Sequence, residues 1–263
     1  MRRWLLFTVA AIACIGIWFV PAIPQDPAYH HFADSRPWLG IANFGDVMSN
    51  LPFAWVGLTG LLWLNRKGMA TINAPLKIHY LIFFAGVALV SLGSGYYHLN
   101  PTNETLLWDR LPMTLAFMSL FSILIAERIS LHIGRRLLWP LMLTGLFSVL
   151  YWHVTELQGQ GDLRLYALVQ FLPILLIPLI LWFYPSSYND TRSLLALLAC
   201  YLAAKLTEFF DPEIFEALGF ISGHTIKHLF AALGVYFYYR GLRDRQPISR
   251  QPHHSSFAER LHS

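Results

Sequence analysis

The chain has 263 residues, of which 56% are hydrophobic and only 13% are charged, whereas about a quarter of a typical soluble domain is charged. The formal net charge is +4 at pH 7. The basic residues are spread over several short loops and form no cluster, so we expect no nucleic-acid partner.

Apolar stretches recur along the whole chain, and each is long enough for a helix to cross a bilayer, which takes roughly 17 to 25 residues. Helices are expected because the edges of an open sheet cannot be satisfied in lipid. The sequence therefore predicts an all-α polytopic membrane protein with a seven-transmembrane helix core and one further N-terminal helix. The predicted spans cover residues 4–22, 47–64, 78–98, 110–127, 137–153, 165–184, 193–209 and 223–240.

Residues 1–24 combine a basic start with an apolar stretch, as a signal peptide does, but they lack a clean small-residue cleavage site. We predict an uncleaved signal anchor or transmembrane helix; the "AIAC" that ends at Cys14 leaves a lipoprotein signal as the alternative. Residues 25–46 are then an extracytoplasmic linker, and 47–242 are the seven-span core. Residues 243–263 are polar and are predicted to be a disordered cytoplasmic tail.

The loops alternate in charge, which predicts an orientation. Of the 19 lysines and arginines, 14 fall on one side of the predicted membrane and three on the other. The positive-inside rule then places both termini in the cytoplasm. The inner membrane of a bacterium is the expected location.

Five polar side chains fall at the ends of three predicted spans, all toward the extracytoplasmic side. Ser94 and His98 are four residues apart at the end of the third span, Asp109 begins the fourth, and His224 and His228 open the last. Residues four apart share one helix face. Ionisable groups inside a membrane are functional candidates by default.

Three imidazoles at such spacing suit a metal. Three neutral ring nitrogens with an open fourth position describe a catalytic zinc site, and zinc lowers the pKa of water to about 7. Taken singly, each feature has a plainer interpretation. The H-x-x-x-H pair could face lipid headgroups, Ser94 could serve helix packing within "GSG", and Asp109 could pair with Arg110.

The combined pattern resembles the alkaline ceramidase family. The matching features are S-x-x-x-H at the end of one span, "LLWDRLPM" at the start of the next, "SGHTIKHL" opening the last, and "IANFGDVMSNLPF" at 41–53. Within these motifs, "GDVMSNLPF" and "DRLPM" are similar to the bacterial ceramidase-like branch of a superfamily of seven-span zinc hydrolases that includes adiponectin-receptor-like proteins. The resemblance covers about residues 25–242.

The resemblance implies an enzyme that cleaves the amide of ceramide or a related N-acyl lipid, giving a free fatty acid and an amine. It implies a zinc ion on His98, His224 and His228, with Asp109 activating the zinc-bound water and Ser94 steadying the oxyanion. The substrate chains would enter between helices. Acyl transfer to water needs these parts: a strong nucleophile, charge stabilisation on oxygen and a proton for the leaving amine.

The resemblance does not extend to a calcium site. Eukaryotic members close such a site with a glutamate before the first core helix, where this chain has Asn43. Asp26, Asp34 and Asp46 lie nearby at a different spacing. We therefore do not expect calcium.

Two further groups of polar residues are candidates for contacts around the site or with substrate. Asp46, Ser49 and Asn50 are predicted to form a polar network beneath the metal ligands. Glu156 and Arg164 lie in an outer loop with glycines, which is either a flexible turn with a salt bridge or a lid that contacts headgroups.

Lys205 and Glu208, three residues apart, are expected to pair near the outer end of their span. Lys227, beside the histidines, is expected to extend to the interface or to meet a carboxylate.

Three other functions remain open at this point. A seven-span receptor or sensor could keep the metal core without hydrolysis, although the short tail carries no recognisable signalling feature. A transporter could use the histidines and Asp109 as a proton or metal relay, but the polar cluster sits at one end of the spans only. A serine protease could use Ser94, which would leave two histidines unexplained. The sequence leaves the oligomeric state open.

Overall fold

The computed structural model describes residues 2–66 and 71–248, and these residues are almost entirely helical. The helices, in chain order, are α1 (Arg2–Gly16), α2 (Phe44–Met48), α3 (Leu51–Arg66), α4 (Lys77–Leu99), α5 (Asn103–Arg128), α6 (Leu131–Leu157), α7 (Arg164–Phe183), α8 (Thr191–Phe209), α9 (Asp211–Leu218) and α10 (Gly223–Asp244). Short 3-10 turns lie at Ile17–Phe19 (η1), Pro27–His30 (η2) and Ala74–Leu76 (η4). The predicted all-α class is confirmed.

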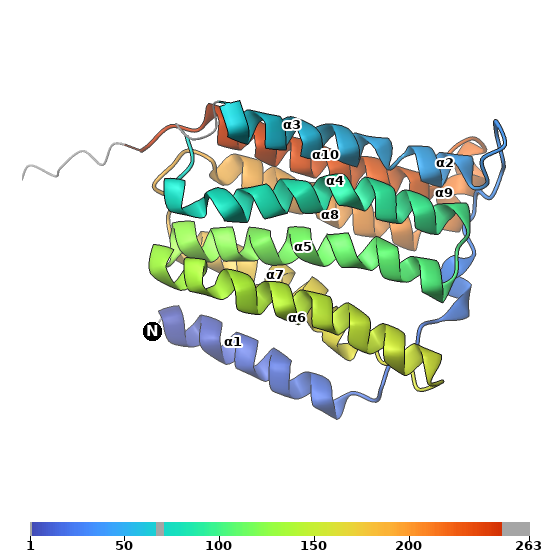
Figure 1. Cartoon of the computed structure of the whole chain (residues 1–263), viewed down its shortest axis with the longest axis horizontal. Helices are drawn as coiled ribbons and strands as arrows, with labels where there is room; N and C mark the ends of the chain where they lie inside the picture. Colours follow the sequence, from blue (N-terminus) through green and yellow to red (C-terminus); the bar gives the residue numbers. More distant parts are fainter. Residues whose placement is uncertain (1, 67–70, 249–263) are drawn as a thin grey trace, which may run out of the picture.

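Six helical segments among the described residues are long and apolar enough to cross a membrane: α1 with η1, α2 with α3, η4 with α4, and then α5, α6 and α7. The predicted seventh span is α8. It is long and apolar enough to cross a membrane when counted together with α9, from which it is separated by a bend of 79°. The predicted last span, α10, is not apolar enough by the same measure, because histidines, a lysine and arginines lower its mean hydropathy. It nevertheless lies within the bundle beside α3 and α8 (Figure 1).

The helices run side by side as one bundle (Figure 1). The N-terminus and the end of α10 lie at the same end, whereas α2 and α9 lie at the opposite end. α1 packs against α7 at the edge of the bundle. We call the end with α2 and α9 the outer end and the other the inner end.

A close approach of α4 and α5 brings the polar residues of these two helices together. A Cβ at Gly93 would overlap the backbone carbonyl oxygen of Trp108. Pro112, one turn further along α5, has no N–H, so it cannot donate the usual helical hydrogen bond to that carbonyl. Glycine at position 93 and proline at 112 thus let the two backbones touch beside Ser94 and Asp109.

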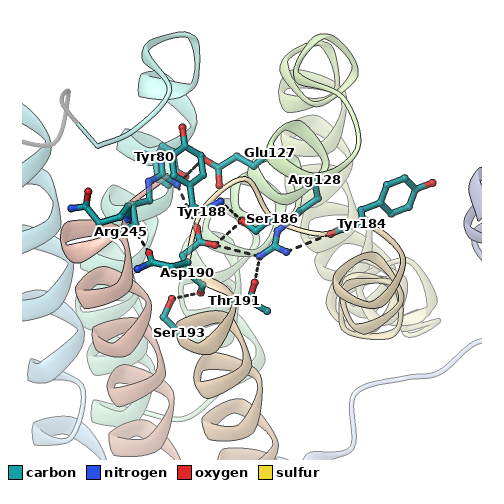
Figure 2. A network of polar contacts seen from close by, with 12 residues as sticks. Tyr80, Glu127, Arg128, Tyr184, Ser186, Tyr188, Asp190, Thr191, Ser193 and Arg245 are labelled. Carbon is teal, nitrogen blue, oxygen red and sulfur yellow. Dashed lines mark hydrogen bonds and ion pairs between the residues drawn. The ribbon is translucent and has the colours of Figure 1, made fainter. Parts of the chain in front are cut away.

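At the inner end, a buried ionic network ties α10 to α5 and α8 (Figure 2). Arg245 is buried and donates to Glu127 Oε1 at 2.9 Å, and Tyr80 donates to the same oxygen at 2.7 Å. Arg128 lies 3.3 Å from Asp190, whose other oxygen is 3.5 Å from Arg245. Two guanidinium groups and two carboxylates therefore neutralise each other out of water.

The predicted tail begins inside this folded end. α10 continues to Asp244, and residues 245–248 pair with the segment before α8, where Ile248 N donates to Ser187 O at 2.9 Å. Residues 249–263, for which disorder was predicted, lie outside the described residues.

Replacing Arg245 should destabilise the protein, because Arg245→Gln leaves Glu127 buried without its cation. Breaking one side of a buried ion pair costs about 3–5 kcal/mol, to be measured by chemical unfolding in detergent micelles. Arg243→Gln is the matched control, since Arg243 is 42% exposed and pairs with exposed Asp244. Equal unfolding midpoints for the two variants would contradict this account of the network.

Candidate active site

Three histidines from two distant parts of the chain meet at the outer end of the bundle. His98 lies in the last turn of α4, and His224 and His228 lie in the first two turns of α10. Their ring centres are 4.9 to 5.0 Å apart, and one nitrogen of each lies within 4.8 Å of the others. All three are buried. The structure thus brings the predicted ligands close enough to share one ion.

The hydrogen bonds of His228 fix which of its nitrogens is free. Ser49 Oγ lies 2.8 Å from His228 Nδ1 and 3.0 Å from the carbonyl oxygen of Asp46. The carbonyl can only accept, so it takes the one hydroxyl hydrogen, and Nδ1–H donates to the serine oxygen. The Nε2 lone pair is therefore left for a metal, as is usual when a second contact orients a histidine ligand.

The other two histidines also fit a metal. His98 Nδ1 is buried and makes no hydrogen bond among the described residues, a costly state for a polar atom that no ion satisfies. His224 Nε2 lies 3.0 Å from Lys227 Nζ. A lone pair serves one partner, so metal binding through Nε2 requires Lys227 to turn to Glu208, with which it already pairs at 2.7 Å. Three neutral imidazoles form a donor set typical of zinc.

The start of α10 is anchored by two carboxylates. Asp46 accepts from Thr225 Oγ1 at 2.7 Å, and Asp211 accepts from the backbone N–H of His224 at 2.7 Å. Ser222 caps the helix by accepting from Thr225 N. Negative charge at a helix N-terminus is stabilising, and these bonds hold the His224–His228 turn in place.

The predicted polar network lies directly beneath the histidines. Asn50 donates to the carbonyl oxygen of Asp46 at 2.8 Å, and Ser49 joins that carbonyl to His228. Three residues that hold the start of α10 were not predicted from the sequence: Asp211, Ser222 and Thr225. A serine just before a helical run is a capping signal, so Ser222 was detectable from the sequence.

Ser94 and Asp109 face each other across the contact between α4 and α5. Both side chains are buried, and the Ser94 hydroxyl lies near the Asp109 carboxylate. Both line the same cavity as His228. A hydroxyl donor and a carboxylate thus lie beside the histidine cluster, in mostly apolar surroundings.

The cavity has a volume of about 470 Å³ and lies between α3, α4, α5, α7, α8 and α10, which is in the range of small-molecule sites. Its polar groups gather at the outer end, and its inner part is apolar. That inner part is lined by Phe53, Phe83, Val87, Val90, Met113, Ala116, Phe117, Leu120 and Val235. The shape and chemistry suit a hydrocarbon chain attached to a polar group.

Glu208 joins two lysines at the cavity wall. It lies 2.6 Å from Lys205 and 2.7 Å from Lys227. The predicted pairing of Lys205 with Glu208 is confirmed, and Lys227 meets a carboxylate. All three residues line the cavity.

The segment between α1 and α2 covers the outer end of the histidine cluster. The ring of Phe32 lies 4.6 Å from that of His98 and 4.5 Å from that of His224. His30 holds the segment down through Tyr97 OH and Asn103 Oδ1, each at 2.9 Å. The prediction of a linker over residues 25–46 does not include this contact, for which the aromatic run "YHHF" is the one signal in the sequence.

Glu156 and Arg164 contact this covering segment, and neither lines the cavity. Glu156 accepts from Gln25 N at 3.1 Å. Arg164 pairs with Asp162 at 2.8 Å and stacks over Trp18 at 5.1 Å. The hydrogen bonds from Arg164 hold the pKa of Asp162 below its usual value.

The residues at and near the position of the family's calcium site are Asn43, Asp34 and Asp26, and each has protein partners. Asn43 adopts a left-handed conformation, with φ of 45°, and donates to the backbone oxygen of His98 at 2.8 Å. Asp34 pairs with Arg36, whose hydrogen bonds hold the pKa of that carboxyl below its usual value. Asp26 accepts from Ala28 N.

Fold and site together define a helical membrane protein with a buried three-histidine cluster at the head of an apolar cavity. The family model described as Ceramidase matches residues 39–210, well over half of the chain, and the chain belongs to this family. Membership implies a hydrolase that acts on the amide bond of ceramide-type lipids. A search of curated proteins gives no match. The matched region contains Ser94, His98 and Asp109 and ends before α10, so the family match does not include His224 and His228, which the structure brings to His98.

Removing the Ser49 hydroxyl should leave the His228 ring without the contact that fixes its orientation. We expect Ser49→Ala to weaken zinc binding about 10- to 100-fold, as loss of a second contact to a histidine ligand usually does. Competition with a chromophoric chelator measures this. Ser122→Ala is the control, because Ser122 is equally buried but bonds to Gly134 O between α5 and α6. Unchanged zinc affinity in Ser49→Ala would show that the contact does not orient the ring.

Proposed function

We propose that this protein is a zinc-dependent intramembrane hydrolase that cleaves the amide of ceramide or a related N-acyl lipid to a free fatty acid and an amine. One observation carries the proposal. His98, His224 and His228 can share an ion at the polar end of an apolar cavity, beside Asp109 and Ser94. Family membership supports the amide bond as the target.

His98, His224 and His228 would hold the zinc. When bound, zinc supplies a Lewis acid that makes water nucleophilic near neutral pH and polarises a carbonyl oxygen. Asp109 takes the proton as the water oxygen bonds to the carbonyl carbon. It returns this proton to the nitrogen as the C–N bond breaks, so one carboxylate serves both halves of the reaction.

Ser94 donates its hydroxyl hydrogen toward the substrate oxygen. Negative charge gathers on that oxygen in the transition state, and a preorganised donor is most effective where water is scarce. Ser94 and Asp109 line the same cavity, so the hydroxyl lies beside the carboxylate that moves the proton. Phe32 covers the outer side of the cluster and limits access of bulk water.

The apolar inner part of the cavity accepts the hydrocarbon chains of the substrate. The cavity is bounded by α7 and α8, which Gln170 and Tyr201 connect by a hydrogen bond of 3.1 Å. We propose that lipid enters from the bilayer on this side. Both ends of the described chain lie at the inner end (Figure 1), which supports termini on one side of the membrane. The basic loops favour the cytoplasm for that side, and the site then lies on the extracytoplasmic side.

The ligand set is tested by His224→Ala with His228→Ala. We expect zinc to fall from about one per chain to almost none and ceramide turnover to fall to background, because one imidazole does not hold the ion. Elemental analysis and a fatty-acid release assay on purified protein measure both. His132→Ala, an exposed histidine at the inner end, should change neither. Continued turnover by a zinc-free double variant would refute the mechanism.

Ser94→Ala separates an oxyanion donor from a nucleophile. We expect kcat to fall about 10²- to 10³-fold, as when one such donor is lost, with zinc content unchanged. Ser91→Ala, a buried serine three residues earlier on α4 that does not line the cavity, should retain activity. If Ser94→Ala abolished acyl transfer while chelators had no effect, a serine nucleophile would replace zinc in the mechanism.

A further inference from the structure

Arg110 is a buried cation beside the site that the proposed chemistry does not use. It follows Asp109 on α5, so it points about 100° around the helix from that carboxylate. Its side chain lies between α5, α6 and α7, with the guanidinium carbon 4.2 Å from the ring centre of Trp152 and 4.8 Å from that of Tyr166. It is 6% exposed and lines the cavity.

The guanidinium of Arg110 is incompletely satisfied. Nη2 donates to Gln25 Oε1 at 2.6 Å, whereas Nη1 is buried and makes no hydrogen bond among the described residues. Arg128, Arg164 and Arg245, which are also mostly buried, each pair with an aspartate or glutamate. Within residues 2–66 and 71–248, Arg110 has no carboxylate in ion-pairing range.

A buried cation without an anion is costly, and the aromatic faces offset only part of this cost. The cavity wall as a whole also carries more positive than negative charge. It carries three basic side chains, Arg110, Lys205 and Lys227, and two acidic ones, Asp109 and Glu208. The two lysines share Glu208, and among the described residues neither Asp109 nor any other carboxylate forms an ion pair with Arg110.

We propose that Arg110 binds an anionic oxygen group, a carboxylate or a phosphate, on the amine half of the lipid substrate. The inference rests on the proposed amide hydrolysis and specifies its substrate class. Guanidinium N–H groups match the geometry of such oxygens, and Nη1 is the donor left free for them.

The position of Arg110 assigns the anion to the amine half. The scissile carbonyl must lie where Ser94, Asp109 and the histidines meet, and the apolar inner cavity takes hydrocarbon. Arg110 instead lies against Gln25 of the covering segment, toward the outer surface. A charged group stays near the membrane surface, so the polar end of the lipid belongs on this side.

The test uses the full chain in lipid nanodiscs and two matched pairs of amides. One pair is ceramide and ceramide 1-phosphate; the other is N-palmitoylethanolamine and N-palmitoylglycine. We expect kcat/KM to favour the anionic member of at least one pair about tenfold or more, the range of a charge-assisted hydrogen bond. The pair that responds distinguishes phosphate from carboxylate.

Arg110→Gln should abolish this preference, mainly through a higher KM for the anionic amide, with kcat for the neutral amide nearly unchanged. Arg110→Lys, which keeps the charge, should retain part of the preference. Arg36→Gln is the control: Arg36 lies at the same end and stacks over Phe215 at 5.0 Å but does not line the cavity. Melting temperatures of all variants show whether each is folded.

The outcomes separate this inference from the proposed function. Wild-type protein that hydrolyses both members of each pair equally, or Arg110→Gln that slows both equally, would overturn the Arg110 assignment while hydrolysis stands. Equilibrium binding of labelled N-palmitoylglycine provides a readout without turnover. If no amide were hydrolysed but wild type bound this probe about tenfold more tightly than Arg110→Gln, the hydrolase proposal would fail and the anion site would stand.

Discussion

The structure depends on holding three neutral imidazoles together where water is scarce. A buried polar nitrogen without a partner is costly, and here one nitrogen of each of three rings lies within 4.8 Å of the others. The surrounding residues all serve this arrangement. Gly93 lets α4 touch α5, Asp46 and Asp211 fix the start of α10, and Ser49 sets the tautomer of His228. These contacts leave three ring nitrogens close enough to hold one metal ion.

The buried charged side chains at the two ends of the bundle are paired to different extents. At the inner end, Arg128 and Arg245 meet Glu127 and Asp190, so the network is electrically closed and holds α10 against α5 and α8 (Figure 2). At the outer end the charges stay unbalanced and line a cavity. The paired charges at the inner end stabilise the fold. The unpaired Nη1 of Arg110 at the outer end is the donor that we propose a ligand binds.

Local patterns in the sequence predicted much of the site. Ser94 with His98, and His224 with His228, share a helix face because their spacing is four residues, and the pairing of Lys205 with Glu208 follows from the same rule. That α4 and α10 meet is a tertiary fact that spacing cannot supply, and the family resemblance was needed to join them. The position of Phe32 could not be predicted either, because it depends on how a loop folds back. Mean hydropathy understates α10, because the polar residues that it carries to the site lower its value although the helix lies within the bundle.

The central claim is that His98, His224 and His228 coordinate one zinc ion, and X-ray absorption spectroscopy of the purified protein tests it most directly. The account predicts about one zinc per chain with three imidazole nitrogens at about 2.0–2.1 Å and one further light-atom ligand. Protein that holds no stoichiometric metal, or a metal whose spectrum lacks imidazole scattering, would contradict it.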